Sequence, residues 1–168
     1  RTIREVIDRC YCCRIGFWDQ GEVYIVPLSF GYEETEGVLR FYFNGAKEGR
    51  KIGLICETPE VGFELDTGYQ LHKAEIACVN SAAFQSVIGN GRIRMVEDIE
   101  EKKKGLALLM EHSTKGAEKR DGKGIKGTDK EDGTADVEKK AWKFDQKSLE
   151  AVCVFRLDVE KLSCKEHL

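Results

Sequence analysis

The sequence predicts an all-β fold, a six-stranded antiparallel barrel with peripheral α-helices. Apolar and polar residues alternate along several short segments, at the period of two that marks half-buried strands. Between the segments lie turns rich in Gly, Asp and Glu, which are too short for the helical crossovers that parallel strands require. These features together favour an antiparallel meander that closes into a barrel.

The first half of the chain supplies three of these strands. A short amphipathic helix is expected to end near Arg9, and a polar turn is expected at residues 31–37. In the first strand Tyr11, Cys13, Ile15 and Phe17 are expected to share one face. The strands are predicted at residues 11–18, 22–30 and 38–44.

The second half changes character more often. Helices are expected at 48–57, from Asp98 onward, and at 144–150, and Asp98 with Glu101 resembles a capping box. Residues 67–83 show no period and are expected to form a long excursion. The remaining strands are predicted at 61–66, at 84–96 with a bulge near Gly89 and Gly91, and at 151–160.

Length and composition fit one cytoplasmic domain, residues 1–168. Residues 113–141 are predicted to be a mobile charged insertion, because they contain no aromatic residue. The 27 basic and 30 acidic residues give a net charge of −3, which argues against a nucleic-acid partner. No apolar run is long enough to span a membrane.

The chain has seven cysteines, an odd number that suits a reduced cytoplasm better than a disulfide framework. Cys10, Cys12 and Cys13 have no matching second pair of ligands, so we expect structural cysteines and no metal site.

Two features point to a binding site. Pro27 lies inside a run of strong strand formers, and because proline cannot donate to a β-ladder, its strand is expected at an edge or a bulge. Such a strand can face a planar heterocycle, or it can simply be an edge protected from aggregation. Gly49, Arg50 and Lys51 open a predicted helix. A helix N-terminus with two cations suits a phosphate group, although a solvated Arg-Lys pair is the alternative.

Several segments together resemble a known family. The runs PLSFGY, FYFNGAKEGRK and SVIGNGRIRMVEDIEEK, and the ending VCVFRLDVEKLSCK, are similar to FMN-binding split barrels related to pyridoxamine 5'-phosphate oxidase. The match is best to the nitroimidazole-resistance (Nim-like) branch. The resemblance implies a Greek-key split barrel that forms a homodimer with FMN at the subunit interface. It also implies FMN-dependent oxidoreductase activity on a small organic substrate.

The resemblance also implies roles for individual residues. One strand would line the flavin ring, the next would face its ribityl chain and phosphate, and the following helix would hold the phosphate. Gln85 and Ser86 would approach the cofactor from the same or the other subunit. The full set of expected cofactor contacts is Val26, Pro27, Leu28, Ser29, Tyr42, Phe43, Asn44, Gly49, Arg50, Lys51, Gln85 and Ser86.

One departure weakens the case for nitroreduction, because Tyr69 stands where Nim-like proteins commonly carry His. No side chain is identified as catalytic. His72 as a haem ligand, Cys78 as a redox thiol and Trp142 as a cover for the flavin ring stay open beside purely structural roles. Two further alternatives are a non-catalytic flavin or haem sensor and a cofactor-free binding protein of the same fold.

Overall fold

The computed structural model of the chain describes residues 2–121 and 142–167. Its β-strands are β1 (Cys13–Asp19), β2 (Glu22–Leu28), β3 (Gly31–Thr35), β4 (Val38–Gly45), β5 (Glu60–His72), β6 (Ser81–Met95) and β7 (Cys153–His167). They form one antiparallel sheet in the order β2-β1-β5-β6-β7-β4-β3. The helices are α1 (Ile3–Ile7), α2 (Arg50–Glu57), the 3-10 turn η1 (Ala77–Val79), α3 (Ile99–Asp121) and α4 (Gln146–Ala151).

The antiparallel split-barrel fold is confirmed, but the sheet has seven strands rather than six. The additional strand is β3, which lies where a polar turn was predicted. β3 is at the sheet edge and pairs only with β4, so it needs no apolar alternation. Its actual turn is confined to Glu36 and Gly37, both at positive φ (55° and 77°).

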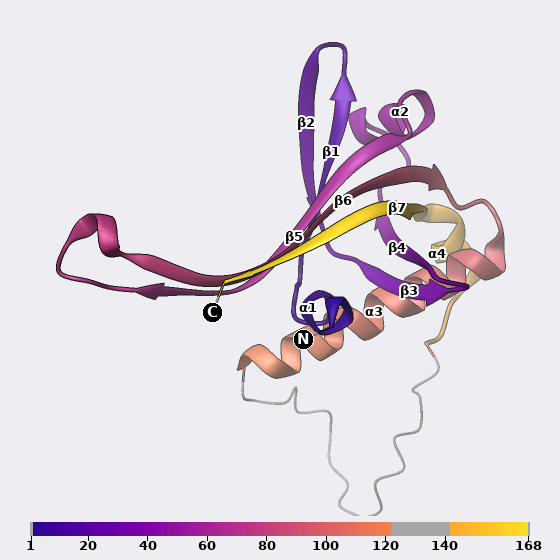
Figure 1. Cartoon of the computed structure of the whole chain (residues 1–168). Helices are drawn as coiled ribbons and strands as arrows, with labels where there is room; N and C mark the ends of the chain where they lie inside the picture. The colour runs from indigo at the N-terminus through magenta and orange to yellow at the C-terminus, as the bar shows by residue number, and fades with distance from the viewer. Residues whose placement is uncertain (1, 122–141, 168) are drawn as a thin grey trace, which may run out of the picture.

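β5, β6 and β7 run beyond the barrel as a curved arm, which extends to the left in Figure 1. The excursion predicted at 67–83 is therefore wrong, because β5 continues to His72 and β6 begins at Ser81. A register shift between Thr67 and Gln70 interrupts the period of two, which is why the sequence pattern is lost there. At the tip, the Asn80 side chain accepts a hydrogen bond from the Ala74 amide at 2.8 Å and orders the loop.

Aromatic side chains fill the barrel. Phe43 and Phe155 stack with their ring centroids 5.5 Å apart, and Phe41 packs against Phe63 at 5.4 Å. Cys13, Ile15 and Phe17 face this core as predicted, whereas Tyr11 is 59% exposed because β1 begins only after it.

The bulge predicted near Gly89 and Gly91 is confirmed, since the β6–β7 register shifts between Asn90 and Gly91. A Cβ added at Gly89 would lie 2.3 Å from the Lys161 carbonyl oxygen, so the two strands approach too closely for any side chain there.

α3 packs along β3 and β4, and α1 lies close to it (Figure 1). As predicted, Asp98 caps α3, accepting a hydrogen bond from the Glu101 amide at 2.7 Å. The helix continues to Asp121, so the first part of the predicted insertion is helical, and residues 122–141 lie outside the described residues. Among the described helices, none combines the length and apolar character needed to cross a membrane.

Candidate cofactor-binding site

α2 begins with an N-terminus suited to an anion. Its first residue is Arg50, and the preceding Gly49 has φ 121°, a left-handed conformation that favours glycine. No side chain caps this end, and its first turn contains no acidic residue. The Ile52 amide already donates to the Gly49 carbonyl at 3.0 Å. The Arg50 and Lys51 amides, for which the described residues provide no acceptor, and the positive end of the helix dipole are therefore available to a negatively charged group.

Lys51 is a cation of this site that has no carboxylate partner among the described residues. Its ammonium nitrogen lies 5.1 Å from the Phe155 ring centroid, and its side chain is half-buried. It extends over the main chain of Gly45, where an added Cβ would be only 2.8 Å from Nζ. The end of β4 and the start of α2 thus form a cradle for a lysine to which the described part of the chain offers no counter-ion.

Arg50 has a different environment. Its guanidinium contacts the Asp19 carboxylate at 2.6 Å and the Glu22 carboxylate at 3.5 Å, and it stacks 4.3 Å above the Tyr24 ring centroid. These three partners all belong to the β1–β2 hairpin. Arg50 therefore joins α2 to the hairpin, a role that the sequence did not indicate.

Pro27 lies in β2 at the edge of the sheet, as predicted, paired with Arg14 of β1. Along this strand Val26 and Leu28 are half-buried against the core, whereas Pro27 and the following Ser29 are exposed. The edge that faces away from β1 is thus open along the four residues predicted to line the flavin ring.

Tyr42 and Phe43 contribute no exposed side chain. Both are fully buried, Phe43 in the barrel and Tyr42 on the opposite side of β4 with Val96 and Val154. Asn44 is exposed at the end of the strand. Neither aromatic side chain is therefore open to a ligand at this site, whereas the side chain of Asn44 is exposed there.

Gln85 and Ser86 lie away from this site within one chain. Both residues belong to the part of β6 at the base of the arm. Across the sheet, Val26 of β2 pairs with Ile15 of β1, Ile15 pairs with Phe63 of β5, and Phe63 pairs with Gly89 of β6. Gly89, rather than Gln85 or Ser86, is therefore the β6 residue level with Val26. Gln85 is 2% exposed and donates a hydrogen bond to Glu166 of β7.

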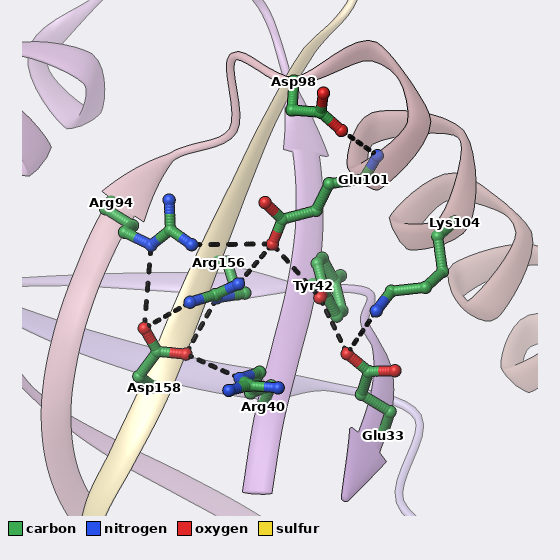
Figure 2. A network of polar contacts seen from close by, with 9 residues as sticks. All are labelled: Glu33, Arg40, Tyr42, Arg94, Asp98, Glu101, Lys104, Arg156 and Asp158. Carbon is green, nitrogen blue, oxygen red and sulfur yellow. Dashed lines mark hydrogen bonds and ion pairs between the residues drawn. The ribbon is translucent and has the colours of Figure 1, made fainter. Parts of the chain in front are cut away.

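A polar network on the α3 side of β4 and β7 was not anticipated (Figure 2). The Tyr42 hydroxyl lies 2.9 Å from Glu33 and 3.3 Å from Glu101, and Lys104 donates to Glu33 at 2.7 Å. Burial alone would raise the pKa of Glu33, but the hydrogen bonds from Lys104 and Tyr42 outweigh it and hold that pKa below its usual value.

The other half of the network is centred on Glu101 and Asp158 (Figure 2). Arg156 bonds to Glu101 and lies 2.8 Å from Asp158, while Arg94 lies 3.6 Å from Glu101. Arg40 is 3.3 Å from Asp158. Because its members come from α3, β3, β4, β6 and β7, the network fixes the helix to the sheet. Its residues are distant in sequence, so no local motif reveals it.

The remaining candidates are dispersed. Tyr69, His72 and Cys78 are exposed on the arm, and Trp142 is half-buried before α4. Over the described residues, no three His, Cys, Asp or Glu side chains come together in a way that could hold a metal ion.

The sequence model of pyridoxamine 5'-phosphate oxidase matches residues 1–137. The chain belongs to this family. The match covers β1 to β6, including the α2 N-terminus and the open edge of β2. Among curated proteins, no sequence matches the chain.

Solved structures of similar fold agree with this assignment. A proposed 5-nitroimidazole antibiotic resistance protein from Bacteroides thetaiotaomicron has a TM-score of 0.70 at 23% identity, over 96% of this chain and 80% of that one. The flavocytochrome Anf3 from Azotobacter vinelandii has a TM-score of 0.67 at 21% identity, over 98% of this chain and 65% of that one. A FAD and haem binding protein from Mycobacterium smegmatis has a TM-score of 0.67 at 14% identity, over 95% and 67% of the two chains. The chain thus spans about two thirds of the length of the last two proteins.

Proposed function

We propose that this protein binds FMN and acts as a flavin-dependent oxidoreductase on a small organic substrate. The observation that carries the proposal is Lys51, a half-buried cation without a carboxylate partner among the described residues, beside the uncapped N-terminus of α2. A phosphate monoester supplies the negative charge that this end of the helix lacks. Family membership and the flavin-binding neighbours support the same cofactor class.

In this proposal the chain positions a flavin, and the flavin, when bound, supplies the electron transfer. The Lys51 side chain and the amides of Arg50 and Lys51 hold the phosphate, and Asn44 lies beside the ribityl chain. The open edge of β2 from Val26 to Leu28, with the following Ser29, offers main-chain groups to the ring, because Pro27 does not donate there. A nicotinamide or another reductant supplies the electrons.

We further propose a homodimer with the cofactor at the subunit interface. The outer face of the β1–β2 hairpin exposes Trp18, Val23 and Ile25, and Ile88 is exposed on β6 in the same direction. A second copy would cover these side chains, and it would bring Gln85 and Ser86 toward the α2 site.

The test is an absorption spectrum of the purified protein, followed by mass spectrometry of the cofactor released by mild denaturation. A flavin spectrum and about one FMN per chain are expected. Release of FAD instead would mean that the site binds flavin but that the cofactor is FAD rather than FMN. A protein that neither contains nor takes up flavin would contradict the proposal.

A haem-binding or non-catalytic role is the second candidate. It is favoured by the two structural neighbours that bind haem and by the exposed His72 on β5. The same spectrum separates the two, because haem gives an intense Soret band. Turnover with a reductant then separates an oxidoreductase from a flavin carrier.

A further inference from the structure

Arg50 and Lys51 are adjacent cations, but their surroundings divide their roles. Arg50 contacts Asp19 at 2.6 Å and Glu22 at 3.5 Å, so its charge is already balanced by this chain. For Lys51 the described residues provide no ion pair. Of these two residues, a phosphate at the start of α2 would therefore meet Lys51 and not Arg50.

The β1–β2 hairpin needs an external support. β5 pairs with β1 only over Arg14–Phe17, so the hairpin tip from Trp18 to Val23 extends beyond the third strand. An isolated two-stranded hairpin is marginally stable in water. In Figure 1 this hairpin stands beside α2, which is the element able to support it.

α2 holds the hairpin at both of its ends. At its N-terminus Arg50 reaches Asp19, and the Asp19 side chain is only 19% exposed while that of Arg50 is 48% exposed. The Arg50 guanidinium also covers the Tyr24 ring, and Tyr24 packs on Phe17 of the core with the ring centroids 6.4 Å apart. At the C-terminal end of α2, the Thr58 hydroxyl donates to the Trp18 carbonyl at 3.1 Å.

We propose that Arg50 is a positioning residue that latches the β1–β2 hairpin onto α2, and that Lys51 rather than Arg50 meets the flavin phosphate. The second part rests on the proposed flavin-binding function. β2 pairs only with β1, so the placement of Val26 to Leu28 depends on the hairpin. The latch thus aligns the strand beside the flavin ring with the helix that holds the phosphate.

The test compares FMN with riboflavin, which lacks the phosphate, by fluorescence titration. Arg50→Ala should weaken both flavins by the same factor, about fivefold, because it loosens the strand beside the ring. Lys51→Ala should weaken FMN by about tenfold and leave riboflavin unchanged, as expected for a lost charged contact. If Arg50→Ala weakens FMN alone, Arg50 is a phosphate ligand and the proposal is wrong.

Asp19→Asn should change FMN affinity in opposite directions, depending on whether Arg50 is a latch for the hairpin or a ligand of the phosphate. If Arg50 is a latch, removing its partner weakens both flavins, and the double variant with Arg50→Ala is no worse than either single variant. If Arg50 serves the phosphate, freeing it from Asp19 strengthens FMN binding, which would overturn the proposal.

Hydrogen exchange in the flavin-free protein tests the latch independently of any cofactor. Arg50→Ala and Asp19→Asn should both speed the exchange of the amides in residues 18–24, while Lys51→Ala leaves them unchanged. Unchanged exchange in the first two variants would refute the latch. If the wild-type protein binds no flavin, the proposed function fails, but this measurement still decides whether the latch exists.

Discussion

Glu101 joins α3 to the arginines of the sheet, and its neutralisation gives a measurable prediction. Its carboxylate bonds to Arg156 and lies 3.3 Å from the Tyr42 hydroxyl and 3.6 Å from Arg94. In Glu101→Gln the shape is kept but the charge is lost. Three arginines, Arg40, Arg94 and Arg156, then share the single carboxylate of Asp158.

The magnitude follows from burial. Breaking a fully buried ion pair costs about 3–5 kcal/mol, whereas an exposed pair contributes about 0–1 kcal/mol. The Glu101 and Arg156 side chains are 19% and 13% exposed, which places this pair between the two limits. We therefore expect Glu101→Gln to lower the free energy of unfolding by about 2 kcal/mol and the Tm by about 4–8 °C.

Chemical denaturation and thermal unfolding measure this effect, and Glu100→Gln is the matched control. Glu100 is the neighbouring residue on α3, but its side chain is 74% exposed and its partner is Lys103 at 2.8 Å. The control should change the stability by less than about 0.5 kcal/mol. If the two variants are equally stable, the network does not fix α3 to the sheet.

Three other predictions concern packing, thiols and assembly. A Cβ at Gly31 would lie 2.3 Å from the Leu108 main chain, so Gly31→Ala should lower the free energy of unfolding by about 2–3 kcal/mol in denaturation experiments. Gly53→Ala in α2 is the control, because a Cβ there meets no neighbour within 4 Å, and this variant should be neutral or stabilising. Burial raises the pKa of Cys10 from about 9 to about 12, so a thiol reagent at neutral pH should leave it unmodified in the folded state and modify it only after unfolding. The Cys10 thiol stays protonated in the folded protein, whereas in the unfolded chain it ionises near pH 9. Its contribution to the free energy of unfolding should therefore fall as the pH rises from about 9 to about 12. A free energy of unfolding that stays constant over that range would contradict the raised pKa. Ile25→Lys should convert the proposed homodimer to a monomer in sedimentation experiments, and a wild-type protein that is already monomeric would rule out the dimer.

The sequence predicted the barrel well where one face of a strand is buried. Cys13, Ile15 and Phe17 alternate because their strand packs on the core, and Gly89 marked a true bulge. β3 escaped prediction because an edge strand carrying Glu33 and Glu34 has no apolar alternation, and its burial comes from α3. The arm escaped prediction because the register shift between Thr67 and Gln70 interrupts the period of two, and because β5 is exposed on both faces from Gly68 to His72, so apolar and polar residues do not alternate there.

The candidate site divides in the same way. The edge position of Pro27 and the helix start at Arg50 follow from local chemistry, since proline lacks an amide donor and glycine allows the turn before α2. The partners of Arg50 could not be predicted from local chemistry. Asp19 and Glu22 are about 30 residues away in the sequence and contact Arg50 only in the folded chain.

An FMN titration of Lys51→Ala tests most directly whether a phosphate-bearing flavin is held at the start of α2. The wild-type protein should bind about one FMN per chain, and Lys51→Ala should bind it about tenfold more weakly. Lys147→Ala, an exposed lysine on α4, should bind as the wild type does. A wild-type protein with no affinity for FMN, or a Lys51→Ala variant that binds FMN as tightly as the wild type, would contradict the account.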